Sequence, residues 1–151
     1  KSLHNKMSIE DKISYYKKTL DCFDDTMEKY RFLLDQGKAS DSFPEEYRED
    51  SFKVTGCQAQ VWLVPYLKSN LMYFYYDSDA FISKGMITIL CDIFQGHTPQ
   101  EIQKCEVDLL SDLKLDVLLT PGRRNGVYSM ILKIKEHANS YINNINIKQD
   151  T

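Results

Sequence analysis

The sequence predicts an α+β fold in which helices pack against a three-stranded antiparallel sheet. Apolar residues recur at three- and four-residue steps towards both ends of the chain, a spacing typical of helices. Between about residues 52 and 76, apolar and polar residues alternate and turn residues follow at short intervals, as in neighbouring strands. The 151 residues are 42% hydrophobic, which is enough for one core. We therefore expect a single domain over residues 1–151.

The N-terminal region is expected to form two helices. Ser8 precedes two acidic residues and is a suitable N-cap. Apolar positions then follow a helical spacing from Ile13 to Leu34, and Gly37 fits the position just after a helix C-terminus. The polar stretch 21–25 divides this run into two helices.

Three short strands are expected next. Phe52 and Val54 alternate with polar residues, a second strand covers about residues 60–66, and a third covers residues 71–76. Since the links are short, the strands should pair in antiparallel order. Pro65 cannot donate a backbone hydrogen bond, which places the second strand at an edge of the sheet or near its own end.

Helical signals return after the third strand. The Asp-Ser-Asp stretch 77–79 is expected to cap a helix that Gly96 closes. The segment 98–101 combines a threonine cap, a proline in the first turn and a glutamate at the third helical position. The pair at residues 120–121 repeats the cap-and-proline signal for a last helix.

Composition excludes several classes of function. The net charge is −3 and no cluster of basic residues stands out, so nucleic acid is not an expected partner. The longest apolar runs, such as residues 86–91, are far too short to span a membrane. The four cysteines form no CxxC pair, which favours reduced thiols and gives no support to a zinc site. The chain begins at Lys1, so we expect a trimmed targeting segment.

The stretch VTGCQAQVW at residues 54–62 is the strongest candidate site. A lone cysteine is more often a buried apolar residue than a reactive one. Here, however, Gly56 permits a tight bend, while Gln58 and Gln60 are poor core residues that suit a polar rim. Cys57, on a loop between two strands, would be held in place yet reachable, as sulfur exchange requires.

Other candidate groups have simpler explanations. A cysteine–histidine catalytic pair would need His4, His97 or His137, and each is expected at the surface. Arg123 and Arg124 in a first helical turn oppose the helix dipole. They are either tolerated surface charge or an arginine fork for a carboxylate of a partner or substrate.

The remaining cysteines and acids are also more simply structural. Cys91 lies among apolar residues and is expected in the core, whereas Cys22 and Cys105 lie near helix ends with no evident partner. Asp77 and Asp79 are most simply helix-start residues.

These motifs together resemble the SufE family, the sulfur-acceptor proteins of iron–sulfur cluster assembly. The segments that carry the resemblance are, in chain order, 44–48 (PEEYR), 54–62 (VTGCQAQVW), 77–80 (DSDA), 84–85 (KG), 98–102 (TPQEI) and 119–123 (LTPGR). They cover most of the chain, from about Glu28 to the final helix. Ala59 and Gly122 stand where the family often has serine, which puts in doubt only a hydroxyl role at those positions.

The resemblance implies a SufE/IscU-like fold and a role in sulfur transfer. Cys57 would take sulfur as a persulfide from a PLP-dependent cysteine desulfurase of the SufS type, stimulate that enzyme, and pass the sulfur to a SufBCD-type scaffold. The chain itself would bind no cofactor or metal and would be an accessory protein rather than a stand-alone enzyme. Gly56 would be the hinge of the loop, and Gln58, Gln60, Asp79 and Arg123 would support the loop or the partner surface.

Two alternatives and the compartment stay open. The chain could be an allosteric activator of the desulfurase that transfers no sulfur, or an iron–sulfur scaffold, which would need several converging ligands. The resemblance and composition favour a plastid-type organelle such as an apicoplast, with the bacterial cytoplasm as the alternative.

Overall fold

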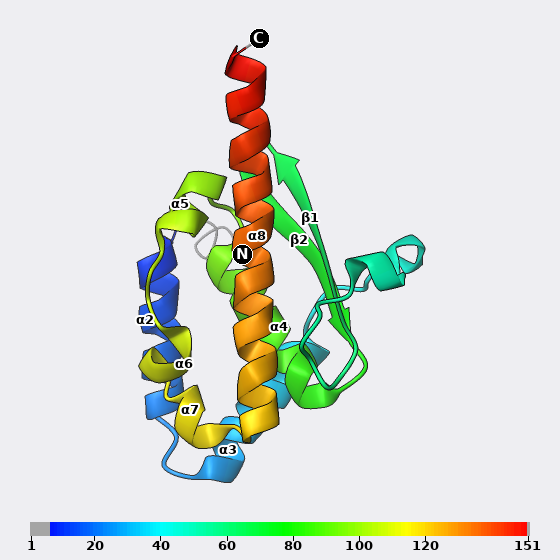
Figure 1. Ribbon diagram of the computed structural model, residues 1–151. Helices are drawn as coiled ribbons and strands as arrows, with labels where there is room; N and C mark the ends of the chain where they lie inside the picture. Colours follow the sequence, from blue (N-terminus) through cyan, green and yellow to red (C-terminus); the bar gives the residue numbers. More distant parts are fainter. Residues whose placement is uncertain (1–6, 151) are drawn as a thin grey trace.

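The computed structural model describes the backbone of residues 7–150 and the side chains of residues 7–144. It is an α+β fold built around one central helix (Figure 1). The elements follow one another as α2 (Ile9–Asp21), α3 (Thr26–Lys38), the 3₁₀ turns η1 (Glu45–Tyr47) and η2 (Asp50–Phe52), β1 (Val61–Lys68), β2 (Leu71–Ser78), α4 (Phe81–Phe94), α5 (Pro99–Lys104), α6 (Leu109–Asp112), α7 (Leu115–Leu118) and α8 (Pro121–Asp150).

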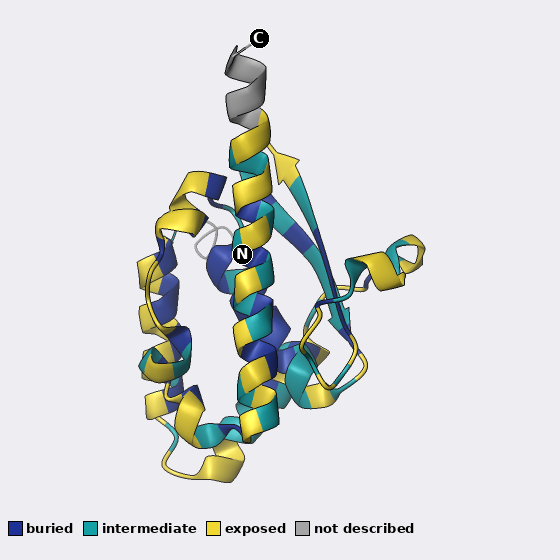
Figure 2. Ribbon diagram, in the orientation of Figure 1, coloured by how far each residue is buried: buried dark blue, intermediate teal, exposed yellow. Residues whose placement is uncertain are grey.

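Helix α4 is the centre of the core. It packs against β2 on one side and against α2, α3 and α8 on the others, and most of its residues from Gly85 to Phe94 are buried (Figure 2). A helix that is apolar around most of its circumference must be covered on all sides. The two-stranded sheet and the three helices provide that cover. None of the helices among the described residues is long and apolar enough to cross a membrane.

Most predicted helix starts are confirmed. The Ser8 hydroxyl accepts a hydrogen bond from the Asp11 amide at 3.0 Å, and Asp25 caps α3 after the polar break. Thr98 and Glu101 form the reciprocal capping box at α5. Thr120 caps α8, where its hydroxyl accepts from the amide of the third helical residue.

The sequence predicted that Gly37 follows the C-terminus of its helix, and this prediction is wrong. Gly37 is buried within α3. A Cβ atom there would approach the backbone nitrogen of Gly85 to 3.0 Å, and a Cβ on Gly85 would overlap the Leu33 carbonyl. The two glycines therefore mark the place where α3 and α4 cross at close range. A glycine that permits such contact looks the same in sequence as one that terminates a helix.

The sheet has two strands, not the predicted three. β1 and β2 pair antiparallel from Val61 opposite Ser78 to Lys68 opposite Leu71, joined by a two-residue turn whose residues both have positive φ. The expected first strand reduces to one bridge, between Lys53 and Trp62. Because η2 coils the chain up to Phe52, only one extended residue pair remains before the Cys57 loop begins.

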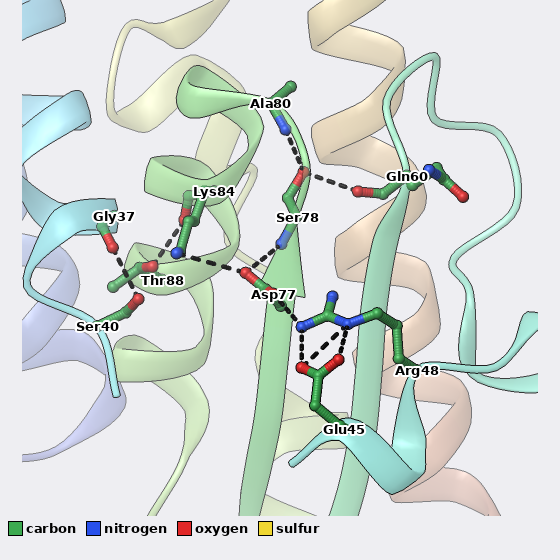
Figure 3. Close-up of polar contacts among 10 residues, drawn as sticks. All are labelled: Gly37, Ser40, Glu45, Arg48, Gln60, Asp77, Ser78, Ala80, Lys84 and Thr88. Atoms are coloured by element: carbon green, nitrogen blue, oxygen red, sulfur yellow. Dashed lines mark hydrogen bonds and ion pairs between the residues drawn. The ribbon is translucent and has the colours of Figure 1, made fainter. Parts of the chain in front are cut away.

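The sequence predicted that the Asp-Ser-Asp stretch 77–79 caps α4, and this prediction is wrong. Asp77 lies in β2 opposite Trp62, and its carboxylate pairs with Arg48 at 2.9 Å and with Lys84 at 3.5 Å (Figure 3). Ala80 occupies the N-cap position of α4 without a side-chain hydrogen bond. The acidic residues are used for tertiary contacts, which outweigh their local capping preference.

A small second apolar cluster covers part of the outer face of the sheet. Its buried members are Phe43, Trp62 and Val64, packed against Tyr47, Phe52 and Tyr75. Through this cluster, the segment before the Cys57 loop packs against β1.

Candidate functional site

Residues 55–60 form a loop that is closed at its base. The Val54 amide donates to the Val61 carbonyl at 2.8 Å, next to the Lys53–Trp62 bridge. From this base the loop extends beside the first turns of α8 (Figure 1). Cys57 is therefore carried by a short segment whose two ends are fixed to each other.

Gly56 gives this loop its bend. Its φ is +92°, a conformation that residues with a side chain rarely adopt. A Cβ atom at this position would also overlap the hydroxyl of Ser129 on α8. Both the backbone angle and the close approach to α8 therefore require glycine here.

The Cys57 side chain is half-buried against α8. Its thiol donates a weak hydrogen bond to the Gly126 carbonyl oxygen, with 3.5 Å between sulfur and oxygen. A Cβ on Gly126 would lie 3.6 Å from the sulfur, so the sulfur rests against bare helix backbone. Burial raises the pKa of the Cys57 thiol, which keeps most of it protonated and unreactive near neutral pH.

A cavity of about 260 Å³ opens beside this thiol. Small side chains line most of it, so there is free space next to the sulfur. The lining residues are Cys57, Gln58, Ala59, Ala80, Ser83, Gly122, Arg123 and Gly126.

Gln60 and Asp79 anchor the far end of the loop. The Asp79 carboxylate accepts hydrogen bonds from the Gln60 backbone amide and side-chain amide, both at 2.9 Å. These bonds lower the pKa of Asp79. The Gln60 carbonyl in turn accepts from the Ser78 hydroxyl at 2.8 Å (Figure 3). Gln60 thus fixes the loop rather than lining the cavity, while Gln58 does line it.

Gln58 lies over the first turn of α8. A Cβ atom on Gly122 would come within 2.7 Å of the Gln58 amide group. The absence of a side chain at Gly122 therefore lets Gln58 fold against the helix and cover part of the cavity.

Arg123 and Arg124 do not form a fork. Arg123 lines the Cys57 cavity, whereas Arg124 lines a different cavity together with Asp116 and Tyr128. Adjacent residues on a helix point in different directions, which accounts for the separation. Between the residues that the structure describes, no salt bridge involves Arg123.

Neither of the two histidines that the structure describes approaches Cys57. His97 pairs with Met72 near the hairpin end of β2, opposite the end where the loop lies. His137 lies about 16 Å beyond Gly126 along α8. His4 lies outside the described residues.

Two histidines also depart from the expected surface position. His97 is buried, and its Nδ1 lies 3.7 Å from a Glu101 carboxylate oxygen. His137 is half-buried, and desolvation lowers its pKa to about 4. The burial of both side chains arises from tertiary contacts that the local polar sequence did not reveal.

The other cysteines lie as the sequence predicted. Cys91 is buried in α4, while Cys22 and Cys105 follow the ends of α2 and α5; of these two, only Cys22 is exposed. Among the described side chains, no group of three or more His, Cys, Asp or Glu residues converges to hold a metal ion.

Sequence reasoning identified Arg123 of α8 but missed the packing of the Cys57 loop on Gly122, Gly126 and Ser129. Gly122 and Gly126 are four residues apart, so they share one face of the helix, and Ser129 extends that face. The spacing of two glycines near the start of a predicted helix could have indicated that another backbone approaches it closely.

Comparisons with known proteins place the chain in a family. The family model of SufE, the Fe-S metabolism associated domain, matches residues 15–138. An uncharacterized SufE-like protein of Rhizobium etli is 35% identical over 120 residues, which cover 76% of this chain and 81% of that protein. One from Synechocystis is 33% identical over 114 residues, covering 76% and 72%.

A solved structure supports the fold independently. The solution structure of a hypothetical protein from Thermus thermophilus superposes with a TM-score of 0.73 over 87% of this chain and 96% of that one. At 14% identity, this similarity concerns the fold alone.

Proposed function

Since this chain belongs to the SufE family, whose domain is associated with Fe-S metabolism, we propose that Cys57 accepts sulfur from a PLP-dependent cysteine desulfurase of the SufS type. The observation that carries the proposal is the half-buried thiol on a glycine-hinged loop beside an open cavity. The sulfur would then pass to a scaffold of the SufBCD type. The PLP belongs to the partner, and this chain would hold no cofactor of its own.

The transfer is a thiol–disulfide type exchange that conserves electrons. The Cys57 thiolate attacks the outer sulfur of the desulfurase cysteine persulfide, a new sulfur–sulfur bond forms, and the old one breaks. The desulfurase cysteine leaves as a thiolate, and Cys57 becomes the persulfide. The cavity beside Cys57 offers room for the added sulfur.

In the free protein the thiol faces α8 and is largely protonated, so transfer requires the loop to move. Cys57 is held inward by one weak thiol–carbonyl hydrogen bond, by packing against the main apolar core and by the packing of Gln58 over Gly122. The contacts at the two ends are stronger, at the Val54–Val61 pair and at Gln60 with Asp79. We therefore expect residues 55–59 to swing outward as a unit on binding of the desulfurase, with Gly56 as the hinge.

Arg123 is the group best placed to assist this step. Its side chain lines the Cys57 cavity. Once the loop has moved, this positive charge would lower the pKa of the nearby thiol or bind a carboxylate of the desulfurase. In Arg123→Ala, weaker stimulation of the desulfurase is expected; unchanged stimulation would remove this role.

Intact-protein mass spectrometry tests the proposal. The chain is mixed with a cysteine desulfurase and L-cysteine, and the mass should increase by whole sulfur atoms that reductant removes. Cys57→Ser should abolish the gain. Cys22→Ser is the matched control, since Cys22 is exposed but lies at the end of α2, and it should retain the gain.

Measuring desulfurase turnover in the same mixtures separates the alternatives. An allosteric activator would raise the turnover of the desulfurase without gaining sulfur, and the Cys57→Ser variant would still raise that turnover. The iron–sulfur scaffold alternative has no support within the described residues, because no set of ligands converges there. Relatives from two Rhizobium species and from Synechocystis favour a bacterial setting and give the plastid-type compartment no support.

A further inference from the structure

Another cavity, which Cys57 does not line, combines aromatic rings with a carboxylate that no described residue pairs with. It measures about 290 Å³ and lies along β2, between that strand and the segment that follows α3. Tyr66, Tyr73, Tyr75 and Tyr76 line it together with Asp41. No lysine or arginine is among its lining residues. Its volume is at the small end of ligand sites, suited to a group of side-chain size.

Three of these tyrosines form a stack on the outer face of the sheet. The Tyr66 ring lies between those of Tyr73 and Tyr75, at centroid distances of 5.7 and 4.7 Å, with interplanar angles of 24° and 25°. All three rings are partly exposed, but stacking covers both faces of Tyr66, and Tyr47 also stacks on Tyr75 at a centroid distance of 5.7 Å. A ligand can therefore reach the ring edges, the hydroxyl oxygens and Tyr73, which stacks with one ring only among the described residues. The small second apolar cluster meets this stack at Tyr75, which belongs to both, and leaves Tyr66 and Tyr73 outside it.

Asp41 supplies a negative charge that no described lysine or arginine pairs with. It is exposed, and no salt bridge between described residues involves it. Burial is the main cause that raises the pKa of Tyr66 and Tyr76, and the charge of Asp41 contributes to both. By contrast, Asp92 in the adjoining cavity is already paired with Lys12 at 2.9 Å. The charge of Asp41 is therefore available to a ligand.

The same sheet face already binds a guanidinium by this chemistry at its other end. The Cζ atom of Arg48 lies 4.7 Å from the Trp62 ring centroid and 5.0 Å from that of Phe43. Its guanidinium also pairs with Asp77 at 2.9 Å (Figure 3). Aromatic rings next to a carboxylate are thus paired with a cation of the chain at one end of the face. At the Tyr66 end, no cation of the described chain lies over the tyrosine rings.

We propose that the cavity formed by Asp41, Tyr66, Tyr73 and Tyr75 binds a guanidinium group. A guanidinium is planar and weakly hydrated, stacks on aromatic rings, and donates to carboxylate and hydroxyl oxygens at the same time. The group comes either from a free small molecule or from an arginine side chain of a protein. This binding is independent of Cys57, so it stands or falls separately from sulfur transfer.

The test follows ¹⁹F NMR signals of the full chain labelled with 3-fluorotyrosine, assigned with single Tyr→Phe variants. Methylguanidinium and the tripeptide Gly-Arg-Gly are the probes, and the uncharged Gly-citrulline-Gly is the isosteric control. We expect saturable shifts of the Tyr66 and Tyr73 signals with the charged probes, with dissociation constants on the order of millimolar. Added salt should weaken them.

Asp41→Asn removes the charge and, being exposed, leaves the fold intact. It should weaken binding about three- to fivefold, whereas Asp24→Asn, an exposed aspartate between α2 and α3, should leave it unchanged. Tyr66→Leu should weaken it further. Tighter binding of the tripeptide than of methylguanidinium assigns the ligand to a protein side chain, and equal binding assigns it to a small cation. Absence of saturable shifts, equal binding of the citrulline peptide, or an unaffected Asp41→Asn variant overturns the proposal.

Discussion

Replacing Gly56 with alanine tests how the Cys57 loop is held against α8. Two separate penalties are expected. The first is the positive φ of +92°, which costs about 1–2 kcal/mol for a residue with a side chain. The second is the overlap of the new methyl group with the Ser129 hydroxyl, which must rotate away while the Ser129 Cβ remains 3.3 Å distant; this adds about 1–2 kcal/mol. The free energy of unfolding should therefore fall by about 2–4 kcal/mol.

The chain contains a matched control for the first penalty. Gly96 has a φ of +79°, and a Cβ there would meet nothing closer than the Tyr73 ring at 4.0 Å. Gly96→Ala should therefore cost only the backbone penalty, about 1–2 kcal/mol. Urea-induced unfolding followed by circular dichroism measures both values.

A double-mutant cycle isolates the second penalty. Combining Gly56→Ala with Ser129→Ala removes the hydroxyl and should restore about 1 kcal/mol of the loss, while the backbone part persists. Sulfur uptake by the Gly56→Ala variant should also slow, because the hinge is stiffened. Equal losses for Gly56→Ala and Gly96→Ala, with no recovery in the double variant, would refute the packing of the loop on α8.

Three further predictions concern the same loop. In the free protein, iodoacetamide should modify exposed Cys22 faster than Cys57, because burial raises the pKa of Cys57 and limits access; desulfurase binding should reverse the order, and mass mapping of the labelled peptides checks this. Gly122→Ser should displace the amide of Gln58 and speed alkylation of Cys57, whereas an unchanged rate would argue against that cover. The hydrogen bonds to Asp79 lower its folded-state pKa, so their stabilisation is present above the unfolded value near 3.8 and is lost as the pH falls through the folded value. Asp79→Asn should therefore lose part of this stability at neutral pH and show a flatter decline in acid than the original chain in unfolding titrations.

The local pattern was sufficient where a structural role depends on neighbours in the chain. The helix caps at Ser8 and Thr98 and the hairpin turn at residues 68–70 involve residues within three positions of each other, and all were predicted. The VTGCQAQVW stretch likewise placed Cys57 on a loop bent at Gly56. In each case the preferred backbone angles and the side-chain hydrogen bonds lie within one turn.

Only the tertiary structure decided what lies across from these residues. Gly37 and Gly85 are required by the approach of another backbone, and Asp77 is used by partners that are distant in sequence. Likewise, the third strand is lost because a 3₁₀ turn at Asp50–Phe52 leaves room for a single bridge. Contacts between distant segments leave no periodic signal in the sequence, because they arise only when the core brings those segments together. The cysteine and its bend are therefore properties of the sequence, whereas the burial, raised pKa and cavity of that cysteine are properties of the fold.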